Sequence, residues 1–276
     1  MSRIYIVLPV HNRRRVTERF VDCLCAQTYA DYHLLLVDDG CSDGTAQMVV
    51  GKVPGSVILS GDGNLWWAGS LQKAYDWLRS HSVDARDLVL IINDDTRIAP
   101  EFLATAVELL EEKTAIMLHA QCREEGSNKL LDDGVQVDWP RLRFTQVHQS
   151  DQVSCLSTRG LFLRVSDFLA SGGFRPGLLP HYLSDYEFTI RLQRQGVKPI
   201  IDPRLQLWTH RHVIPQPVTG WRAAWQAMRC RRNPSNLRAW LAFVLMSCPW
   251  PWKPLCLLRV FQFASVRFAK LALGRG

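Results

Sequence analysis

The stretch His33-Leu34-Leu35-Leu36-Val37-Asp38-Asp39-Gly40 sets an apolar, strand-like run directly before two carboxylates and a glycine. Two other runs end in the same manner. Ile4–Leu8 leads into Pro9-Val10-His11-Asn12-Arg13, and Leu88–Ile92 leads into Asn93-Asp94-Asp95. In an open α/β sheet, ligands bind beyond the carboxyl ends of the strands. The three polar clusters therefore mark the expected position of a ligand site.

Apolar runs alternate with helical patterns over the first two-thirds of the chain, which is typical of an α/β sheet with helices on both faces. We expect further strands at Val57–Leu59 and Leu205–Trp208. Residues 126–154 are irregular and polar, which predicts hairpins. Helices are expected at Arg14–Gln27, from about Thr45, and at Leu71–Leu78, Pro100–Leu110 and Asp185–Gln195, where Gly196 ends the last one.

The charge of the chain is divided unevenly along its length. Residues 203–276 hold twelve Lys or Arg and no Asp or Glu, whereas the first 202 residues carry a net charge of −5. After His212 the composition changes to Trp, Arg and Leu, so we place a boundary near Pro215–Gly220. The basic tail favours an anionic partner, either a lipid surface or a nucleic acid. No known nucleic-acid-binding motif is present in it, so we expect no nucleic-acid partner.

The eight cysteines are scattered without zinc-site spacing. The first residues enter a strand-like run without the apolar core and cleavage site of a signal peptide. We therefore expect reduced thiols and a cytoplasmic protein.

The strand-end clusters favour nucleotide and metal chemistry over a dinucleotide site. The turn after the first strand offers Pro, Asn and Arg in place of the G-x-G-x-x-G expected of a Rossmann site. An Asp at the end of the second strand suits a uracil or thymine imide N–H, or ribose hydroxyls. An acidic pair after the fourth strand suits a hard divalent cation that also binds diphosphate oxygens.

Four segments together resemble glycosyltransferase family 2, in the order and spacing of that family, over residues 3–212. Taken together, the resemblance implies an α/β protein with the GT-A fold, a Rossmann-like mixed sheet that binds a nucleotide-sugar. The segments are Ile6-Val7-Leu8-Pro9-Val10-His11-Asn12-Arg13, Leu36-Val37-Asp38-Asp39-Gly40-Cys41-Ser42-Asp43-Gly44-Thr45, Leu90-Ile91-Ile92-Asn93-Asp94-Asp95-Thr96 and Leu183-Ser184-Asp185-Tyr186-Glu187-Phe188.

The resemblance implies a domain at 1–215, with a nucleotide-binding half over about 1–97 and an acceptor half over 98–215. Residues 216–276 then form a basic, Trp-rich helical region. Pro9, Val10, Asn12 and Arg13 would line the nucleotide pocket, and Asp38 would contact the base with Asp39 beside it. A tight turn is the alternative explanation for Asp38-Asp39-Gly40.

Asn93-Asp94-Asp95 matches the D-x-D motif of the family, which implies that Asp95 contacts a divalent metal, Mg²⁺ or Mn²⁺. Asn93 stands where the first Asp often lies, so the metal would have fewer protein ligands. A helix cap before Pro100 is the alternative. His210 would complete the metal or diphosphate site, although a lone His is usually structural and His212 lies nearby.

Asp185 matches the Asp of the family's E-D motif, which implies the general base of an inverting transfer. Ser184 replaces the usual Glu. Glu187 is the competing candidate for the base, and an N-cap of the following helix is the alternative role for Asp185.

Two further loops resemble segments of the family. Asn64 and Gly69 would approach the nucleotide, and Trp66-Trp67 either stack on a sugar or base or anchor the next helix in the core. Arg159 would face the diphosphate, and Gly160 would permit a close backbone approach to the donor. A simple turn is the alternative for this pair.

The resemblance thus implies a metal-dependent transfer from a UDP- or dTDP-sugar to a hydroxyl of a glycan or glycolipid, in bacterial surface-polysaccharide or lipopolysaccharide synthesis. A nucleotidyltransferase is the nearest rival, but residues 9–15 lack the glycines of its triphosphate loop. A catalytically idle nucleotide-sugar-binding scaffold is the second rival, and the presence of Asp95 and Asp185 disfavours it.

The tail predicts amphipathic helices that lie on a membrane. The longest uncharged run, Ala239 to Trp252, is too short to span a bilayer and contains two prolines. We expect peripheral contact with an anionic membrane at its cytoplasmic face. Packing on the catalytic domain or a homodimer interface is the alternative. The apolar positions are Trp221, Ala224, Trp225 and Met228, then Leu237, Trp240, Leu241, Val244 and Leu245, then Leu257, Phe261, Ala264 and Phe268.

Overall fold

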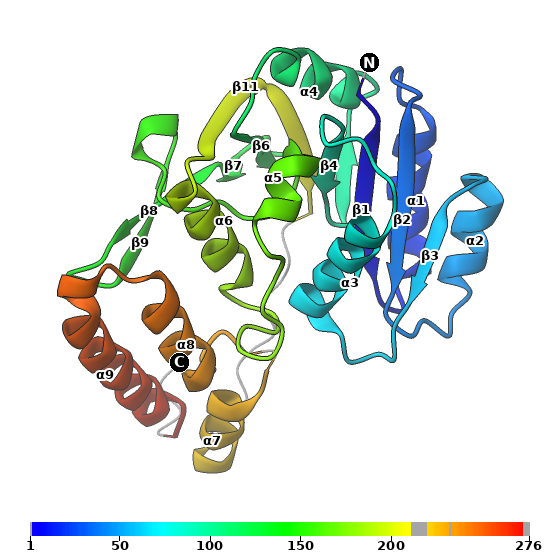
Figure 1. Ribbon diagram of the computed structural model, residues 1–276. Coiled ribbons are helices and arrows are strands. Elements are labelled where there is room, and N and C mark those ends of the chain that lie inside the picture. Colours follow the sequence, from blue (N-terminus) through cyan, green and yellow to red (C-terminus); the bar gives the residue numbers. More distant parts are fainter. Residues whose placement is uncertain (1, 211–219, 232, 273–276) are drawn as a thin grey trace.

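The computed structural model describes residues 2–210, 220–231 and 233–272 (Figure 1). The strands are β1 Ile4–Val10, β2 Tyr32–Asp38, β3 Val57–Ser60, β4 Leu88–Ile91, β5 Thr96–Ile98, β6 Ile116–Glu124, β7 Leu130–Asp132, β8 Gly134–Asp138, β9 Arg143–Val147, β10 Leu161–Arg164 and β11 Lys198–Thr209. The helices are α1 Arg14–Cys25, α2 Thr45–Lys52, α3 Trp66–Ser80, α4 Phe102–Leu110, α5 Val165–Ala170, α6 Ser184–Arg194, α7 Trp221–Arg229, α8 Leu237–Ser247 and α9 Lys253–Ala272, with short 3₁₀ turns at Ser150–Gln152 and Trp250–Trp252.

A mixed sheet organises the first 210 residues, and its strands lie in the order β3-β2-β1-β4-β10-β6-β11-β5. β1 pairs in parallel with β2 and β4, and β2 pairs in parallel with β3. Val10 is therefore in register with Asp38, and Asp38 with Ser60. The polar segments that follow these strands meet at one edge of the sheet, as the sequence predicts.

Two layers of helices cover the sheet because side chains of β1 alternate between its faces. Ile4, Ile6 and Leu8 pack with α1, α2 and α4, whereas Tyr5 and Val7 pack with α3, α5 and α6. This period of two is what an extended strand buried on both faces requires. The predicted α/β class, a mixed sheet with helices on both faces, is confirmed.

The predicted hairpins of residues 126–154 are present. β7 pairs with β6, and β8 pairs with β9 in a separate two-stranded sheet. The eight cysteines are all free thiols.

The C-terminal helices pack beside α6 and the β8–β9 hairpin (Figure 1). Phe243 of α8 is fully buried and stacks on Trp139, at 5.9 Å between ring centroids. Arg194 of α6 donates to the carbonyls of Met246 and Ser247 at the end of α8. Within the described residues, no helix is both long and apolar enough to cross a bilayer. The boundary predicted near Pro215–Gly220 falls largely in 211–219, outside the described residues.

Candidate active site

Asp39 organises the loop that joins β3 to α3. Its carboxylate accepts backbone N–H groups from Gly63 at 2.8 Å, Leu65 at 3.1 Å and Trp66 at 3.2 Å. The three donors lie at the start of α3, where N–H groups have no partner within the helix. Asp39 therefore acts across the sheet edge as a cap for a helix that begins 27 residues later.

Asp38 closes the turn that follows β2. Its Oδ1 accepts the backbone N–H of Cys41 at 2.7 Å. Gly40 has φ +70°, and a Cβ there would lie 2.8 Å from the backbone nitrogen of Gly63. Asn12 fixes the same region, since its Oδ1 accepts the N–H of Ser42 at 2.8 Å. The tight turn is thus present, and Asp38 and Asn12 hold loops in place.

A cavity of about 350 Å³ opens at the carboxyl ends of β1, β2 and β4, and we call it the strand-end cavity. Asp38 and Asn12 are not among the residues that line it. The other predicted residues of this region do line it, namely Pro9, Val10, Arg13, Asp39, Asn93 and Asp94. Its walls are Pro9, Val10, His11, Arg13, Asp39, Trp66, Trp67, Ser70, Asn93, Asp94 and His181.

The guanidinium of Arg13 bridges the two carboxylates that follow β4. Its Nη1 lies 3.0 Å from Asp94 Oδ1, and its Nη2 lies 3.4 Å from Asp95 Oδ2. Asp94 is buried and also accepts the hydroxyl of Thr17 at 2.8 Å. Burial raises the pKa of Asp94, and Arg13 opposes that rise. The pair does not cap a helix, because β5 follows it directly.

His210 lies beside Asp95 in the fold, but its ring points to another acid. The hydroxyl of Thr209 donates to the backbone carbonyl of Asp95 at 2.9 Å. The His210 ring, with a side chain 71% exposed, lies 3.1 Å from Glu125. No group of three His, Cys, Asp or Glu side chains gathers around a possible metal position in the described residues. His212 lies outside those residues.

The side chains after β4 nevertheless fit a metal that arrives with a diphosphate. Mg²⁺ is commonly bound by one or two carboxylates, with water and substrate phosphates as its other ligands. Asp95 lines neither cavity, and its Oδ2 lies 3.4 Å from Arg13 Nη2, whereas Asn93 lines both cavities. The donor set is hard oxygen throughout, as this metal class requires.

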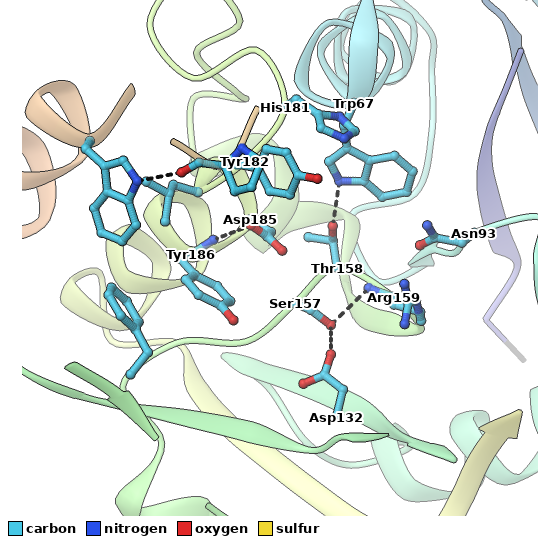
Figure 2. A pocket seen from close by; sticks show the side chains of 14 residues that line it. Trp67, Asn93, Asp132, Ser157, Thr158, Arg159, His181, Tyr182, Asp185 and Tyr186 are labelled. Atoms are coloured by element: carbon cyan, nitrogen blue, oxygen red, sulfur yellow. Dashed lines mark hydrogen bonds between the residues drawn. The ribbon is translucent and has the colours of Figure 1, made fainter. Parts of the chain in front are cut away.

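A second cavity of about 410 Å³ adjoins the first, and we call it the α6 cavity (Figure 2). The two share Trp67, Asn93 and His181. The other residues that line the α6 cavity are Asp132, Phe144, Ser157, Thr158, Arg159, Tyr182, Leu183, Asp185, Tyr186, Pro234 and Trp240.

Asp185 lies in the first turn of α6 and faces this cavity (Figure 2). Its Oδ1 accepts the backbone N–H of Tyr186 at 3.0 Å. Burial raises the pKa of Asp185 to about 7; the Tyr186 N–H and the Arg159 charge lower it, and Asp132 raises it further. Leu183 holds the N-cap position, so the N-cap alternative does not describe Asp185.

Glu187 points away from both cavities. It is 5% exposed and accepts two hydrogen bonds from Arg191, at 2.8 and 3.0 Å. Arg191 also donates to the carbonyls of Ser171 and Gly173. Arg191 thus joins α6 to the loop after α5, and Glu187 holds Arg191 in place.

The sequence comparison settles the family. The chain matches the model described as Glycosyl transferase family 2 over residues 5–165. The chain belongs to this family. No curated protein matches in sequence.

Solved structures of glycosyltransferases share the fold at low sequence identity. A mannosyltransferase of Pyrobaculum calidifontis, PcManGT, in complex with GDP-Man and Mn²⁺, is 17% identical with a TM-score of 0.60, over 99% of this chain and 76% of that one. S. aureus TarS, residues 1–349 with UDP-GlcNAc, is 13% identical with a TM-score of 0.63, over 98% and 89%. GalNAc-T7 with UDP, GalNAc and Mn²⁺ is 11% identical with a TM-score of 0.64, over 96% and 55%.

Arg159 and Gly160, two neighbouring residues predicted from the family pattern, differ in their surroundings. Arg159 lines the α6 cavity; burial opposes its charge, but Cys122, Asp95 and Asp132 leave its pKa raised. Gly160 has φ +77° and makes its close approach to β11, because a Cβ there would lie 2.5 Å from Leu207. It therefore packs in the core.

Asn64 and Gly69 line a separate hollow of about 430 Å³ beside α3, together with Lys73 and Arg231. Trp66 borders both this hollow and the strand-end cavity. The Trp67 indole donates to Thr158 at 2.9 Å and packs against the core below α3. This position of Trp67 is compatible with both predicted roles, a core anchor of the helix and a ring that stacks on a sugar or base.

Several cavity residues have no signal in the family motifs. Asp132 stands in the irregular segment 126–154, and Trp240 stands beyond residue 165, where the family match ends. His181 and Tyr182 also line the cavities without a motif signal, whereas His11 belongs to the first family motif. Only the pairing of β7 with β6 and the packing of α8 on α6 bring Asp132 and Trp240 to the site.

Proposed function

We propose that this protein is an inverting glycosyltransferase that moves a sugar from a UDP- or dTDP-sugar to a hydroxyl of a glycan or glycolipid, with a divalent metal. The position of Asp185 carries the proposal. Its carboxylate, with a pKa of about 7, faces a cavity that adjoins the strand-end cavity. A general base works best when its pKa lies near the working pH.

In the proposed reaction, the donor nucleotide occupies the strand-end cavity and the acceptor occupies the α6 cavity. The acceptor hydroxyl oxygen bonds to the anomeric carbon while the bond from that carbon to the diphosphate breaks. Asp185 takes the hydroxyl proton, and the diphosphate leaves with the bonding electrons. A single displacement of this kind inverts the anomeric configuration.

Charge on the leaving diphosphate needs cationic partners at the junction of the cavities. Arg13 and Arg159 line the two cavities on either side of Asn93. Asp95 and Asn93 would hold the metal, which supplies further positive charge to the diphosphate. The nucleotide would lie against Pro9, Val10 and Arg13. Asp39 lines this wall and Asp38 holds the adjoining turn, whereas the sequence predicts a direct contact of Asp38 with the base.

Product analysis with a panel of nucleotide-sugars, with and without Mn²⁺, tests the reaction class. We expect release of a nucleoside diphosphate that depends on Mn²⁺. Release of pyrophosphate from a nucleoside triphosphate and a sugar phosphate would indicate a nucleotidyltransferase instead. Nucleotide-sugar binding without turnover, across the panel and with sugar acceptors present, would indicate the scaffold.

Asp185→Asn tests the base. We expect turnover to fall by about 10²–10⁴-fold, with donor affinity unchanged, because the base acts only on the acceptor proton. Asp151→Asn, at an exposed position, is the matched control. Retention of more than about a tenth of wild-type turnover contradicts the assignment.

Asp95→Ala tests the metal. We expect Mn²⁺ to tighten nucleotide-sugar binding to the wild type and not to the variant, as calorimetry would measure. His210→Ala should change this metal dependence little, because the His210 ring pairs with Glu125. Equal metal dependence in Asp95→Ala and wild type would remove Asp95 from the site.

We also propose that the basic C-terminal helices rest on an anionic membrane at its cytoplasmic face, in bacterial surface-polysaccharide or lipopolysaccharide synthesis. The exposed aromatic side chains of α7 and of the turn before α9 support this proposal. Arg222 lies over the Trp221 ring, Arg229 over Trp225 and Lys253 over Trp250, at 5.2–6.0 Å. Such Trp–cation pairs suit the headgroup region. A homodimer through the same surface is the alternative.

A further inference from the structure

The α6 cavity contains a second carboxylate that the proposed reaction does not use. Asp132, at the end of β7, accepts the hydroxyl of Ser157 at 2.5 Å through Oδ2. Figure 2 shows Asp132 and Asp185 on opposite sides of this cavity. In the described part of the chain, no protein hydrogen bond engages Asp132 Oδ1. One oxygen of a half-buried carboxylate is therefore available to a hydroxyl donor.

A buried histidine fixes the orientation of Asp132. His119 is fully buried, and its Nε2 lies 3.1 Å from Ser157 Oγ. Burial lowers the pKa of His119. Because the Ser157 hydroxyl donates to Asp132, Ser157 Oγ is left to accept the Nε2–H of His119. This chain of hydrogen bonds holds Ser157, and Ser157 holds Asp132.

Three aromatic rings form the other end of the α6 cavity. Phe144 stacks on Tyr186 at 5.7 Å between centroids and meets Trp240 edge-on at 5.8 Å. The Trp240 indole donates to the carbonyl of Pro234 at 2.8 Å, which fixes the ring. The cavity is thus polar at the Asp132 end and aromatic at the Trp240 end.

A sugar ring is complementary to a cavity with one polar end and one aromatic end. Its hydroxyls donate to carboxylates, and its C–H faces pack on aromatic rings, as in sites that combine apolar walls with a few placed polar groups. A lipid alcohol or a Ser or Thr side chain brings one hydroxyl. One hydroxyl satisfies Asp185 and leaves Asp132 Oδ1 without a donor in a cavity that the acceptor closes to water, which is costly.

We propose that the acceptor is a saccharide, held in the α6 cavity with its reacting hydroxyl at Asp185, a second hydroxyl of the same sugar unit at Asp132 Oδ1, and Trp240 packed on its ring. This inference rests on the proposed transfer reaction and names its acceptor class. Asp132 is a positioning residue that selects the acceptor, and it takes no proton in the reaction.

The C-terminal helices thereby become part of the acceptor site. Asn236 caps α8 by accepting the N–H of Ala239 at 2.9 Å, and Val244 and Phe243 are buried beneath the hairpin. Trp240 is held on this helix by the same packing. The Trp240 side of the acceptor site therefore lies outside the segment that the family match covers, whereas Asp132 lies within it.

Saturation-transfer NMR with a panel of methyl glycosides, in the presence of UDP, tests the proposal. The panel contains glucose, galactose, mannose, N-acetylglucosamine and rhamnose, and octanol and a Ser-containing peptide serve as single-hydroxyl probes. We expect at least one glycoside to bind the wild type. Asp132→Ala and Trp240→Ala should weaken that glycoside by about 10–100-fold. UDP signals should persist in every variant.

Matched variants distinguish a loss of glycoside recognition from a loss of folding. Asp132→Asn keeps the size of the side chain, and Trp240→Phe keeps an aromatic face. Trp250→Ala, at a position 79% exposed and outside the cavity, should bind glycoside like the wild type. Singly deoxygenated glycosides give the sharpest result. Loss of one particular hydroxyl should weaken binding to the wild type and leave binding to Asp132→Ala unchanged.

The outcomes distinguish this inference from the reaction on which it rests. If neither UDP nor dTDP in its place binds, the proposed function fails. If UDP binds but glycosides bind equally well to wild type, Asp132→Ala and Trp240→Ala, the acceptor site lies elsewhere and the inference is wrong. If UDP binds and no glycoside in the panel binds, or only octanol or the peptide does, the saccharide class is wrong.

Discussion

Aspartates at this site differ in role because their surroundings differ. Asp39 directs both oxygens at backbone N–H groups, whereas Asp185 accepts one N–H and faces an open cavity. Burial raises the pKa of Asp185 to about 7, and Asp132 and Arg159 act on it in opposite directions. Asp39 is thus a scaffold group and Asp185 the group suited to proton transfer.

We expect the kcat/KM for transfer to rise about tenfold per pH unit below pH 7 and to level off above it, because Asp185 must be ionised to accept a proton. Asp132→Asn removes a neighbouring negative charge and should shift this midpoint to lower pH. A pH–rate profile of both proteins measures the effect. A flat profile from pH 5.5 to 8.5 in the wild type would contradict it.

Asp185 should also destabilise the fold at neutral pH. Its pKa is about 7 in the folded protein and about 4 in an unfolded chain. Between these values the folded state binds more protons than the unfolded state, so the free energy of unfolding falls as the pH rises. Above pH 7 the loss is complete, about 4 kcal/mol for a shift of roughly three pKa units at 1.4 kcal/mol per unit.

Asp185→Asn should therefore unfold at a higher temperature than wild type at pH 8 and at nearly the same temperature at pH 4. The asparagine keeps the acceptor for the Tyr186 N–H and carries no charge. Thermal unfolding at several pH values, with Asp151→Asn as the exposed control, measures the difference. A variant less stable than wild type at pH 8 would be inconsistent with a desolvated Asp185.

Site residues that stand in motifs could be predicted from the sequence. Site residues that strand pairing brings from elsewhere in the chain could not. Arg13, Asn93 and Asp185 line cavities where the family pattern puts them. Asp38 and Asp39 were predicted as a pair, but the sequence does not show which carboxylate the turn engages. Asp132 reaches the site through the pairing of β7 with β6, and neither strand contains one of the motifs.

At the scale of elements, α3 shows why a boundary escapes prediction. The apolar pattern predicts a helix over Leu71–Leu78, but the helix begins at Trp66. No Ser, Thr, Asp or Asn occupies its N-cap position, which is Leu65. The carboxylate that satisfies the first N–H groups belongs to Asp39, which is remote in sequence. β11 is likewise longer than Leu205–Trp208, because its bulge between Ile201 and Gln206 accommodates Pro203.

The Asp39 cap leads to a stability prediction. Asp39→Ala should lower the free energy of unfolding by roughly 1–3 kcal/mol, because three backbone N–H groups lose their acceptor. Nucleotide affinity should fall too, since the loop lines the strand-end cavity. Asp62→Ala is the control: it removes one exposed acceptor, for the N–H of Asn64. If denaturant unfolding gives both variants the same free energy of unfolding, Asp39 does not cap α3.

At the scale of the whole molecule, the C-terminal helices have two different surfaces. α8 is packed into the protein through Phe243 and Val244. α7 and α9 carry exposed apolar side chains among basic ones. Removing everything after Gly220 would therefore uncover the core as well as remove a surface. The exposed apolar side chains of α7, of the turn before α9 and of α9 are Trp221, Trp225, Trp250, Trp252, Leu258, Phe261, Phe263 and Val266.

We expect the full chain to sediment with vesicles that contain anionic lipid at low salt and to be released at high salt. Each basic residue near such a surface contributes about 1 kcal/mol, and this attraction is screened by salt. A variant with Trp221, Trp225, Trp250 and Phe261 changed to serine keeps the charge and the α8 packing. It should bind less at every salt concentration, because aromatic insertion is lost. The control is Val50→Ser, an exposed apolar position on α2.

Vesicles of different composition and size-exclusion chromatography then distinguish membrane binding from dimerisation. Neutral phosphatidylcholine vesicles should retain little protein, because residues 203–276 carry basic side chains and no acidic ones. If the full chain stays in the supernatant with anionic vesicles at low salt, the membrane proposal is wrong. A dimer that the four-serine variant converts to monomer would then assign the exposed aromatic surface to a second copy of the chain.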